Sequence, residues 1–186
     1  MYFIRQARLP ALLATISLLG ACFVSDEPLI PTGEAVLPID YGLTLCPDLP
    51  DDCFFMRAEA DGYTTLPNTD DDENGAARFF PLMQVQGRQI FLLEAYDLED
   101  DTYTYLVARR RGDGETGEAD LDLALISCSD LTEAQMSQFV AAGGHTGSGF
   151  ASGCTSPDLE TLSATLRNAY GAHFADETWW ASSGTD

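Results

Sequence analysis

The chain has 186 residues, with 30 acidic side chains against 9 basic ones and a formal charge of −21. Such an acidic chain repels phosphate backbones, which argues against nucleic acid as a partner. All the bases are arginines, and this excludes a Schiff-base lysine, a Ser-Lys dyad and a phosphate-loop lysine.

The first 21 residues have the pattern of a secretory signal peptide. Arg5 and Arg8 form a positive start, residues 9–19 are mostly apolar, and the small residues Gly20 and Ala21 follow. The apolar run is too short and too mixed to span a bilayer, which takes about 20 apolar residues. We therefore expect residues 1–21 to be removed as a leader.

The leader ends in Leu19-Gly20-Ala21-Cys22, which resembles the lipobox of bacterial lipoprotein precursors. The resemblance implies that Cys22 is lipid-modified on sulfur and becomes the mature N-terminus, with its amine acylated by a fatty acid such as palmitate. Stable anchoring takes more than one acyl chain, and such a group supplies them. The alternative is a secreted protein cut after Ala21, with Cys22 an ordinary thiol.

The residue after Cys22 is Phe23 rather than aspartate. Aspartate at that position often marks inner-membrane retention in lipoproteins, so the resemblance implies an outer-membrane protein that faces the periplasm. Without Arg5 and Arg8, the formal charge becomes −23.

Residues 22–45 contain Pro28, Pro31 and Pro38 among small and acidic residues, and these prolines favour an extended chain. We expect this segment to be a tether that begins at the lipidated Cys22 and holds the domain off the bilayer. Residues 46–176 are then a single α+β domain, since a chain of this length suffices for one core. Residues 177–186 are expected to be a frayed C-terminal tail.

Four cysteines remain besides Cys22, namely Cys46, Cys53, Cys128 and Cys154. An even number in an oxidising compartment favours two disulfides. Pairing of nearest neighbours gives Cys46–Cys53 and Cys128–Cys154, and the other two connectivities stay open. The spacings are not those of a zinc site.

Short β-prone segments separated by turns occupy residues 53–128. They are Cys53–Glu59, Tyr63–Leu66, Arg78–Val85, Gln89–Tyr96, Thr102–Arg110 and Leu121–Leu125. Gln86-Gly87 is a tight hairpin signal, and in Leu121–Leu125 leucines alternate with more polar residues, so that the leucines should face inward. The pattern predicts an antiparallel meander, either open or closed like a barrel.

Two helical segments follow the strands. Thr132 and Gln135 form a capping box at the start of the first helix, and Gly143-Gly144 ends it. The second helix is expected to start at Ser156 with Pro157 in its first turn. The predicted fold class is α+β, with an antiparallel sheet followed and covered on one face by a C-terminal pair of helices.

An acidic turn precedes the third strand. Asp70, Asp72, Asn74 and Gly75 resemble the first half of an EF-hand-like calcium loop. The later positions of such a loop fall on Arg78 and Pro81 instead of oxygen ligands. A solvated turn is the favoured interpretation, and a weak structural Ca²⁺ site is the alternative. No other cofactor is expected.

Tyr103, Tyr105 and Arg109 lie on one face of the fifth predicted strand, Thr102–Arg110, because they alternate along it. Such an aromatic stripe is a candidate surface for a small ligand or a glycan. The plainer interpretation is that it belongs to the core.

No convincing catalytic set stands beside the lipobox. The only histidines are His145, in a glycine-rich loop, and His173, which helical spacing places on the apolar face of the second helix. We therefore expect a non-enzymatic, lipid-anchored envelope protein that binds a partner protein or envelope component, or assists assembly. The alternatives are a periplasmic module for a small ligand and, last, a small hydrolase using His145 or His173.

Overall fold

The computed structural model describes residues 22–40, 42–45, 54–65, 75–97, 101–111, 121–147 and 153–183. Its strands are β1 (Phe23–Ser25), β2 (Gly42–Leu45), β3 (Phe54–Glu59), β4 (Gly62–Thr65), β5 (Ala76–Val85), β6 (Arg88–Asp97), β7 (Thr102–Arg110), β8 (Leu121–Leu125), β9 (His145–Thr146) and β10 (Cys154–Thr155). Its helices are α1 (Glu133–Ala141), α2 (Leu159–Tyr170) and α3 (Glu177–Ser183), with 3₁₀ turns η1 (Thr32–Glu34), η2 (Cys128–Asp130) and η3 (His173–Ala175).

Strands β2 to β8 form an antiparallel meander in which each strand pairs with the next along the chain. β1 continues along the same edge of β7 as β8, and β10 then pairs with β1 in parallel. The sheet is open, with β2 and β9 as its ends, so the predicted α+β fold and meander are confirmed and the barrel-like alternative is not.

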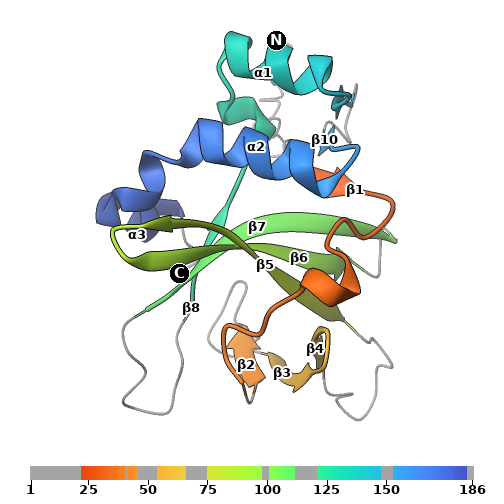
Figure 1. Cartoon of the computed structure of the whole chain (residues 1–186), viewed down its shortest axis with the longest axis vertical. Helices are drawn as coiled ribbons and strands as arrows, with labels where there is room; N and C mark the ends of the chain where they lie inside the picture. Colours follow the sequence, from red (N-terminus) through yellow and green to blue (C-terminus); the bar gives the residue numbers. More distant parts are fainter. Residues whose placement is uncertain are drawn as a thin grey trace, which may run out of the picture.

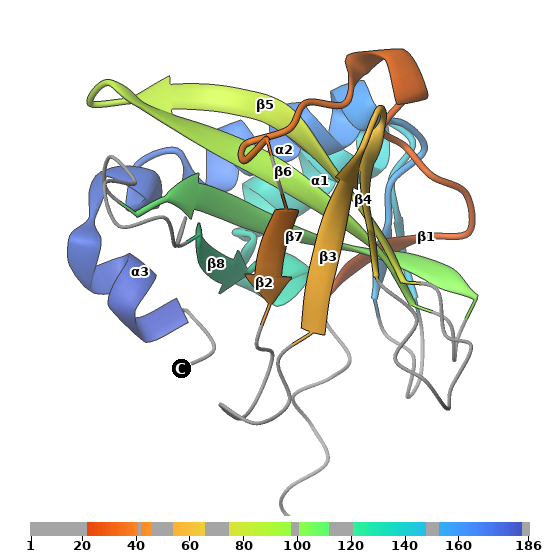
Figure 2. The ribbon, with the colours of Figure 1, turned by 90° about the horizontal axis from the view of Figure 1, so that it is seen from below.

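The sheet is packed on both faces (Figures 1 and 2). Helices α1, α2 and α3 lie on one face of the central strands β5 to β7, where the larger apolar cluster forms. On the other face the sheet curls, so that β2, β3 and β4 cross over β6 and β7 (Figure 2). There Met56 and Tyr63 pack with Phe91 and Leu93 in a second apolar cluster.

The hairpin between β5 and β6 has a tight turn of two residues, one fewer than the predicted strands Arg78–Val85 and Gln89–Tyr96 leave between them. Gln86 and Gly87 both have positive φ angles, 52° and 81°, as the tight hairpin turn that matches strand twist requires. Farther along, the β5–β6 pairing shifts between Pro81 and Met83. The carbonyl of Leu82 in this bulge accepts a hydrogen bond of 2.8 Å from Arg167 Nε of α2, so the irregularity attaches the helix to the sheet.

The expected tether over residues 22–45 is wrong for residues 22–40, which belong to the fold. Phe23, Ile30 and Ile39 are 0%, 1% and 3% exposed. The hydroxyl of Tyr63 donates to the Ile39 carbonyl at 2.7 Å and accepts from the Ile39 amide at 3.0 Å. Between Pro31 and Pro38 the chain forms the 3₁₀ turn η1 instead of staying extended. The folded unit therefore includes residues 22–40 and does not begin at residue 46.

The C-terminal boundary also differs from the prediction. Residues Glu177–Ser183 form α3 rather than a frayed tail. Trp180 is 3% exposed, and its indole Nε1 donates to the carbonyl of Phe174 at 3.1 Å. A large aromatic side chain with a satisfied polar atom holds the chain end on the sheet.

Helix α1 begins and ends as the sequence indicates. Thr132 and Gln135 form both hydrogen bonds of the capping box. Gly143 has φ +97° and donates to Val140, while Gly144 donates to the carbonyl of Phe139, each at 3.0 Å. This pair of bonds is a Schellman motif.

We expect Gly144→Ala to destabilise the protein by about 1–3 kcal/mol, the usual cost of overpacking a core. A Cβ at Gly144 would lie 2.4 Å from ring atoms of Phe139, which is itself buried. Gly33→Ala is the matched control, because nothing lies within 4 Å of its Cβ. Urea unfolding of both variants measures the difference, and equal losses would contradict this packing.

Helix α2 begins at Leu159 instead of Ser156, and its N-cap is Asp158. The Asp158 carboxylate accepts from the Thr161 amide at 2.7 Å. This hydrogen bond holds the pKa of Asp158 below its ordinary value of 3.8.

Asp158→Ala should therefore cost about 0.5–2 kcal/mol at neutral pH, the range for losing an N-cap. Because the folded-state pKa is lowered, this contribution is present above the ordinary aspartate pKa and is lost as pH falls through the folded value. Asp158→Asn should keep the cap and weaken only its pH dependence. Urea titrations at neutral and acidic pH test this, and a difference between native and alanine proteins that persists in strong acid would contradict it.

Candidate functional site

Cys22 lies within the sheet, directly before β1. At this position β8 stops pairing with β7, and β1 pairs with the next part of the same edge of β7. Its carbonyl accepts the amide of Cys154 at 2.9 Å, and it forms an isolated antiparallel bridge with Ser127. The side chain is half-buried, and burial raises the pKa of the Cys22 thiol. The predicted lipidation position is thus fixed by backbone contacts of the domain itself.

The residue next to Cys22 anchors it to the core. Phe23 packs edge-on against Phe139 of α1, with ring centroids 5.7 Å apart. Gly153, before β10, passes so close that a Cβ there would lie 3.0 Å from the Cys22 carbonyl oxygen and 3.1 Å from Val24. No flexible residue therefore separates Cys22 from the packed domain.

A disulfide braces the same region. Cys128 and Cys154 are bonded, with Cα atoms 6.0 Å apart, as one of the two predicted pairings requires. Cys128 is in η2 and Cys154 in β10, so the bond joins the two segments that flank Cys22. Cys46 and Cys53 lie outside the described residues.

A buried carboxylate holds the segment that follows β1. Glu94 of β6 is 1% exposed, and its Oε2 accepts the backbone amides of Leu29 at 2.6 Å and Ile30 at 2.9 Å. The hydroxyl of Tyr105 donates to the same oxygen at 3.0 Å, and Arg78 Nη1 lies 3.5 Å from Oε1. We call Glu94, Tyr105, Arg78 and Ser25 the Glu94 cluster.

The Glu94 cluster also reaches β1 itself. The hydroxyls of Ser25 and Tyr105 lie 2.7 Å apart, and Ser25 donates to the Glu27 carbonyl at 2.6 Å. Burial raises the pKa of Tyr105 far above its usual range, and the charge of Glu94 raises it further. Tyr105 is therefore a neutral donor to Glu94 at all physiological pH values.

The predicted ligand face of Tyr103, Tyr105 and Arg109 is covered rather than open. Tyr105 is 1% exposed in the Glu94 cluster, and Tyr103 is half-buried against Tyr96, with ring centroids 5.1 Å apart. Arg109 is 6% exposed. The plainer interpretation of the stripe, as part of the core, therefore fits these residues.

Arg109 is held by partners on two other elements. Its Nε donates to Asp122 of β8 at 2.8 Å and its Nη2 to Glu177 of α3 at 2.5 Å. The guanidinium also lies 4.6 Å from the ring centroid of Trp180, a cation–π geometry. This arginine joins β7, β8 and α3, and its donors are already directed at carboxylates.

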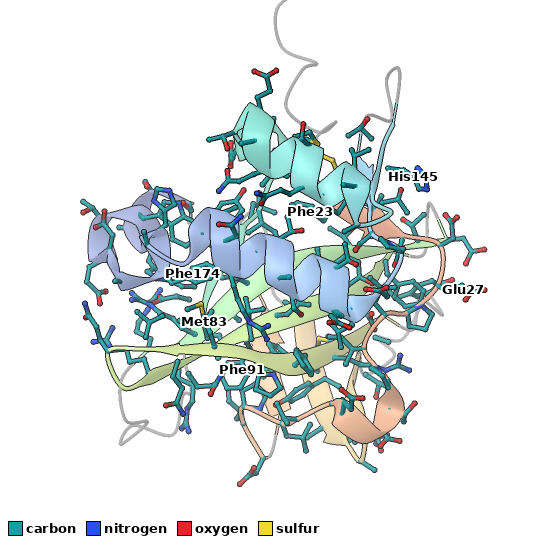
Figure 3. The ribbon with its side chains drawn as sticks, turned by 45° about the horizontal axis from the view of Figure 1, so that its top comes forward. Phe23, Glu27, Met83, Phe91, His145 and Phe174 are labelled. Carbon is teal, nitrogen blue, oxygen red and sulfur yellow. A yellow bond between two sulfur atoms is a disulfide. The ribbon has the colours of Figure 1, made fainter. Side chains whose placement is uncertain are left out.

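The two histidines do not lie together. His145 is exposed in β9, before α2, and His173 is exposed in η3, after α2. Figure 3 shows His145 and Phe174, the neighbour of His173, at opposite ends of α2, a helix of 12 residues and hence about 18 Å long. The expectation that His173 lies on the apolar face of that helix is wrong, since the helix ends at Tyr170.

The candidate ligands of the calcium loop, Asp70, Asp72 and Asn74, lie outside the described residues. Within the described ranges, no group of three or more His, Cys, Asp or Glu side chains could hold a metal ion. None of the described helices is long and apolar enough to cross a membrane.

Glu94 is a buried carboxylate that the motifs in the sequence did not indicate. One signal for it exists in the sequence. Glu94 is the only charged residue in the run Gln89–Tyr96, which is otherwise rich in large apolar side chains. A charge inside such a strand is rarely buried without partners, so its position predicts a local polar cluster.

No protein-family model matches this chain, and neither a curated protein nor a solved structure matches it.

Proposed function

We propose that this chain is a lipid-anchored protein of the bacterial cell envelope whose domain binds a partner protein or envelope component. The lipid is carried by Cys22, and the domain faces the periplasm from the outer membrane. The observation that supports this proposal most is the position of Cys22. The lipobox-like sequence ends directly before Phe23, which is buried, so removal of residues 1–21 leaves intact all the contacts that β1 makes with the described residues.

Binding, rather than enclosure of a small ligand, is favoured by the packing of the sheet. Both faces carry apolar clusters in the part of the chain that the structure describes. The stripe of Tyr103, Tyr105 and Arg109 is engaged by partners within the fold. Because His145 in β9 and His173 in η3 lie on either side of α2, a hydrolase would have to use one of these histidines without the other.

Mass spectrometry of the protein purified from its native membranes tests the anchor. We expect a polypeptide of residues 22–186 with a diacylglyceryl group on the Cys22 sulfur and an acylated amine. Cys22→Ala should abolish acylation and leave the leader uncleaved, since the sulfur that receives the lipid is gone. A bare Cys22 sulfur in the native protein would overturn the proposal.

Crosslinking and pull-down from native membranes test the binding role. A stable, specific protein partner is expected. Copurification of a defined small molecule instead would favour the periplasmic ligand-binding module.

A further inference from the structure

One segment of the chain is almost free of charge. Residues 131–157 contain a single acidic side chain, Glu133, and no lysine or arginine, in a chain with 30 acidic residues. Acidic residues resume at once on either side, at Asp130 and Asp158. The described part of this segment, residues 131–147 and 153–157, comprises α1, β9 and β10. We call it the cap.

The cap contacts Cys22 and the neighbouring residues of β1. β10 pairs with β1, the amide of Cys154 donates to the Cys22 carbonyl, and Phe139 of α1 packs on Phe23. Figure 1 places α1, β1 and β10 toward one end of the long axis of the molecule, with β2, β3 and β4 at the other end. The lipidation position and the charge-poor surface therefore occupy the same end.

Exposed apolar side chains occur in the same region. Among the described residues, the large hydrophobic side chains that stay exposed are Leu125 and Val140, each 49% exposed. Val140 follows Phe139, which contacts Phe23. Leu125 lies two residues before Ser127, which pairs with Cys22. Both are thus close to the anchor rather than scattered over the surface.

The absence of a tether limits how far the domain can stand from the bilayer. Ten extended residues would span about 33 Å, but Cys22 itself is part of the sheet and Phe23 is 0% exposed. Acyl chains on the Cys22 sulfur must enter the bilayer, so the surface around Cys22 is brought to the headgroups.

Electrostatics selects the orientation. Anionic headgroups repel acidic side chains, and the repulsion extends over about one Debye length, roughly 8–10 Å at physiological salt. A domain with a formal charge near −23 after loss of Arg5 and Arg8 is repelled least when its charge-poor end faces the membrane.

We propose that the cap is the membrane-facing surface of the protein and rests on the lipid headgroups beside the acylated Cys22, with β2, β3 and β4 directed away from the bilayer. This inference rests on the proposed lipid anchor and adds the orientation. In this orientation, β2, β3 and β4 face the periplasm.

Site-specific photocrosslinking in vesicles tests the orientation. The full, natively acylated protein is reconstituted into phosphatidylethanolamine–phosphatidylglycerol vesicles that contain a fluorescent phospholipid. The photoreactive residue p-benzoylphenylalanine replaces either Val140 in the cap or Asp61, an exposed residue in the turn between β3 and β4. Circular dichroism and the mass of the Cys128–Cys154 peptide verify that each variant is folded.

We expect fluorescent lipid adducts at Val140 and none above background at Asp61. Adducts at Asp61 alone, adducts at both positions, or no lipid adduct at Val140 would overturn the proposed orientation. In native membranes, crosslinking of Val140 to a protein instead of lipid would also overturn it and would identify the cap as a partner's docking surface. The mass of the Cys22 peptide in the same samples separates the two proposals, because an unacylated Cys22 overturns the anchor itself.

Discussion

Replacing Glu94 by alanine is expected to lower the free energy of unfolding by about 3–5 kcal/mol, the range for removing one partner of a buried charged network. The Glu94 carboxylate is 1% exposed and accepts from the amides of Leu29 and Ile30 and from the hydroxyl of Tyr105. Its loss leaves the Ile30 amide without its acceptor and leaves the Leu29 amide with only the Tyr105 hydroxyl, at 3.3 Å, and each buried unsatisfied donor costs about 1–3 kcal/mol.

The interaction with Arg78 contributes less than these hydrogen bonds. The Nη1 atom of Arg78 lies 3.5 Å from Glu94 Oε1, and the arginine side chain is 30% exposed. Solvent screens that attraction, as it does for surface pairs. The expected loss therefore comes mainly from release of the chain around Leu29 and Ile30.

Urea unfolding gives the total effect, and hydrogen exchange of the Leu29 and Ile30 amides locates it. Glu94→Gln keeps an acceptor for these amides but loses the charge, so its loss should be smaller than that of Glu94→Ala. Glu59→Ala removes a carboxylate from an exposed pair with Arg57 and should cost no more than about 1 kcal/mol. A Glu94→Ala protein as stable as Glu59→Ala would refute the role of the Glu94 cluster.

The Glu94 cluster attaches the segment that follows β1 to the sheet. Ser25, the last residue of β1, contacts Tyr105, and the amides of Leu29 and Ile30 donate to Glu94. With the Glu94 cluster intact, this segment is held against β6 and β7. With Glu94 removed, the released segment approaches the free tether that prolines and acids alone suggest.

Local chemistry explains which features the sequence could predict. The Gln86-Gly87 turn, the Thr132–Gln135 capping box and the Gly143-Gly144 helix end each depend on residues a few positions apart. Such signals act before any tertiary contact forms, so the observed elements agree with them. The Cys128–Cys154 pairing also followed from sequence proximity.

Tertiary packing explains which features the sequence could not predict, and β8 is an example. Alternation along Leu121–Leu125 predicted leucines facing inward and acids facing water. Leu121 and Leu123 do pack against the second apolar cluster, but Asp122 points to Arg109 with 12% of its side chain exposed, and Leu125 is 49% exposed. The alternation rule assumes one solvated sheet face, and here both faces of the neighbouring strands are covered.

The prediction of a tether was wrong for residues 22–40 for a related reason. Average composition there is that of a linker, yet Phe23, Ile30 and Ile39 enter the core. Their partners Phe139, Glu94 and Tyr63 are distant in sequence. Burial of a few widely spaced side chains has no periodic signature, so only the folded arrangement reveals it. The candidate site around Cys22 depends on these same long-range contacts.

Removing the Cys128–Cys154 disulfide with the double variant Cys128→Ala/Cys154→Ala is expected to cost about 2–4 kcal/mol. The cysteines are 26 positions apart, and for that loop the chain-entropy relation gives about 3.5 kcal/mol at 25 °C. Both side chains are buried, at 5% and 0% exposure, so the cavities that the truncations leave add to the loss.

The location of the bond gives this prediction a local signature. Cys154 donates its amide to the Cys22 carbonyl, while η2, which holds Cys128, follows Ser127, the bridge partner of Cys22. Loss of the bond should therefore accelerate hydrogen exchange in β1 and β10 more than in the β5–β6 hairpin, which contains no cysteine. Uniformly faster exchange would indicate that the disulfide does not act on this region in particular.

Dithiothreitol provides the control and extends the test to the second predicted bond. If Cys46–Cys53 is also a disulfide, the reductant should destabilise the double variant further, because that bond is still intact in it. If the reductant leaves the double variant unchanged, Cys128–Cys154 is the only disulfide that contributes to stability. A double variant that unfolds at the same urea concentration as the native protein would contradict the bracing of the Cys22 region. In that case, closing this loop with a disulfide would not favour the folded state over the unfolded state.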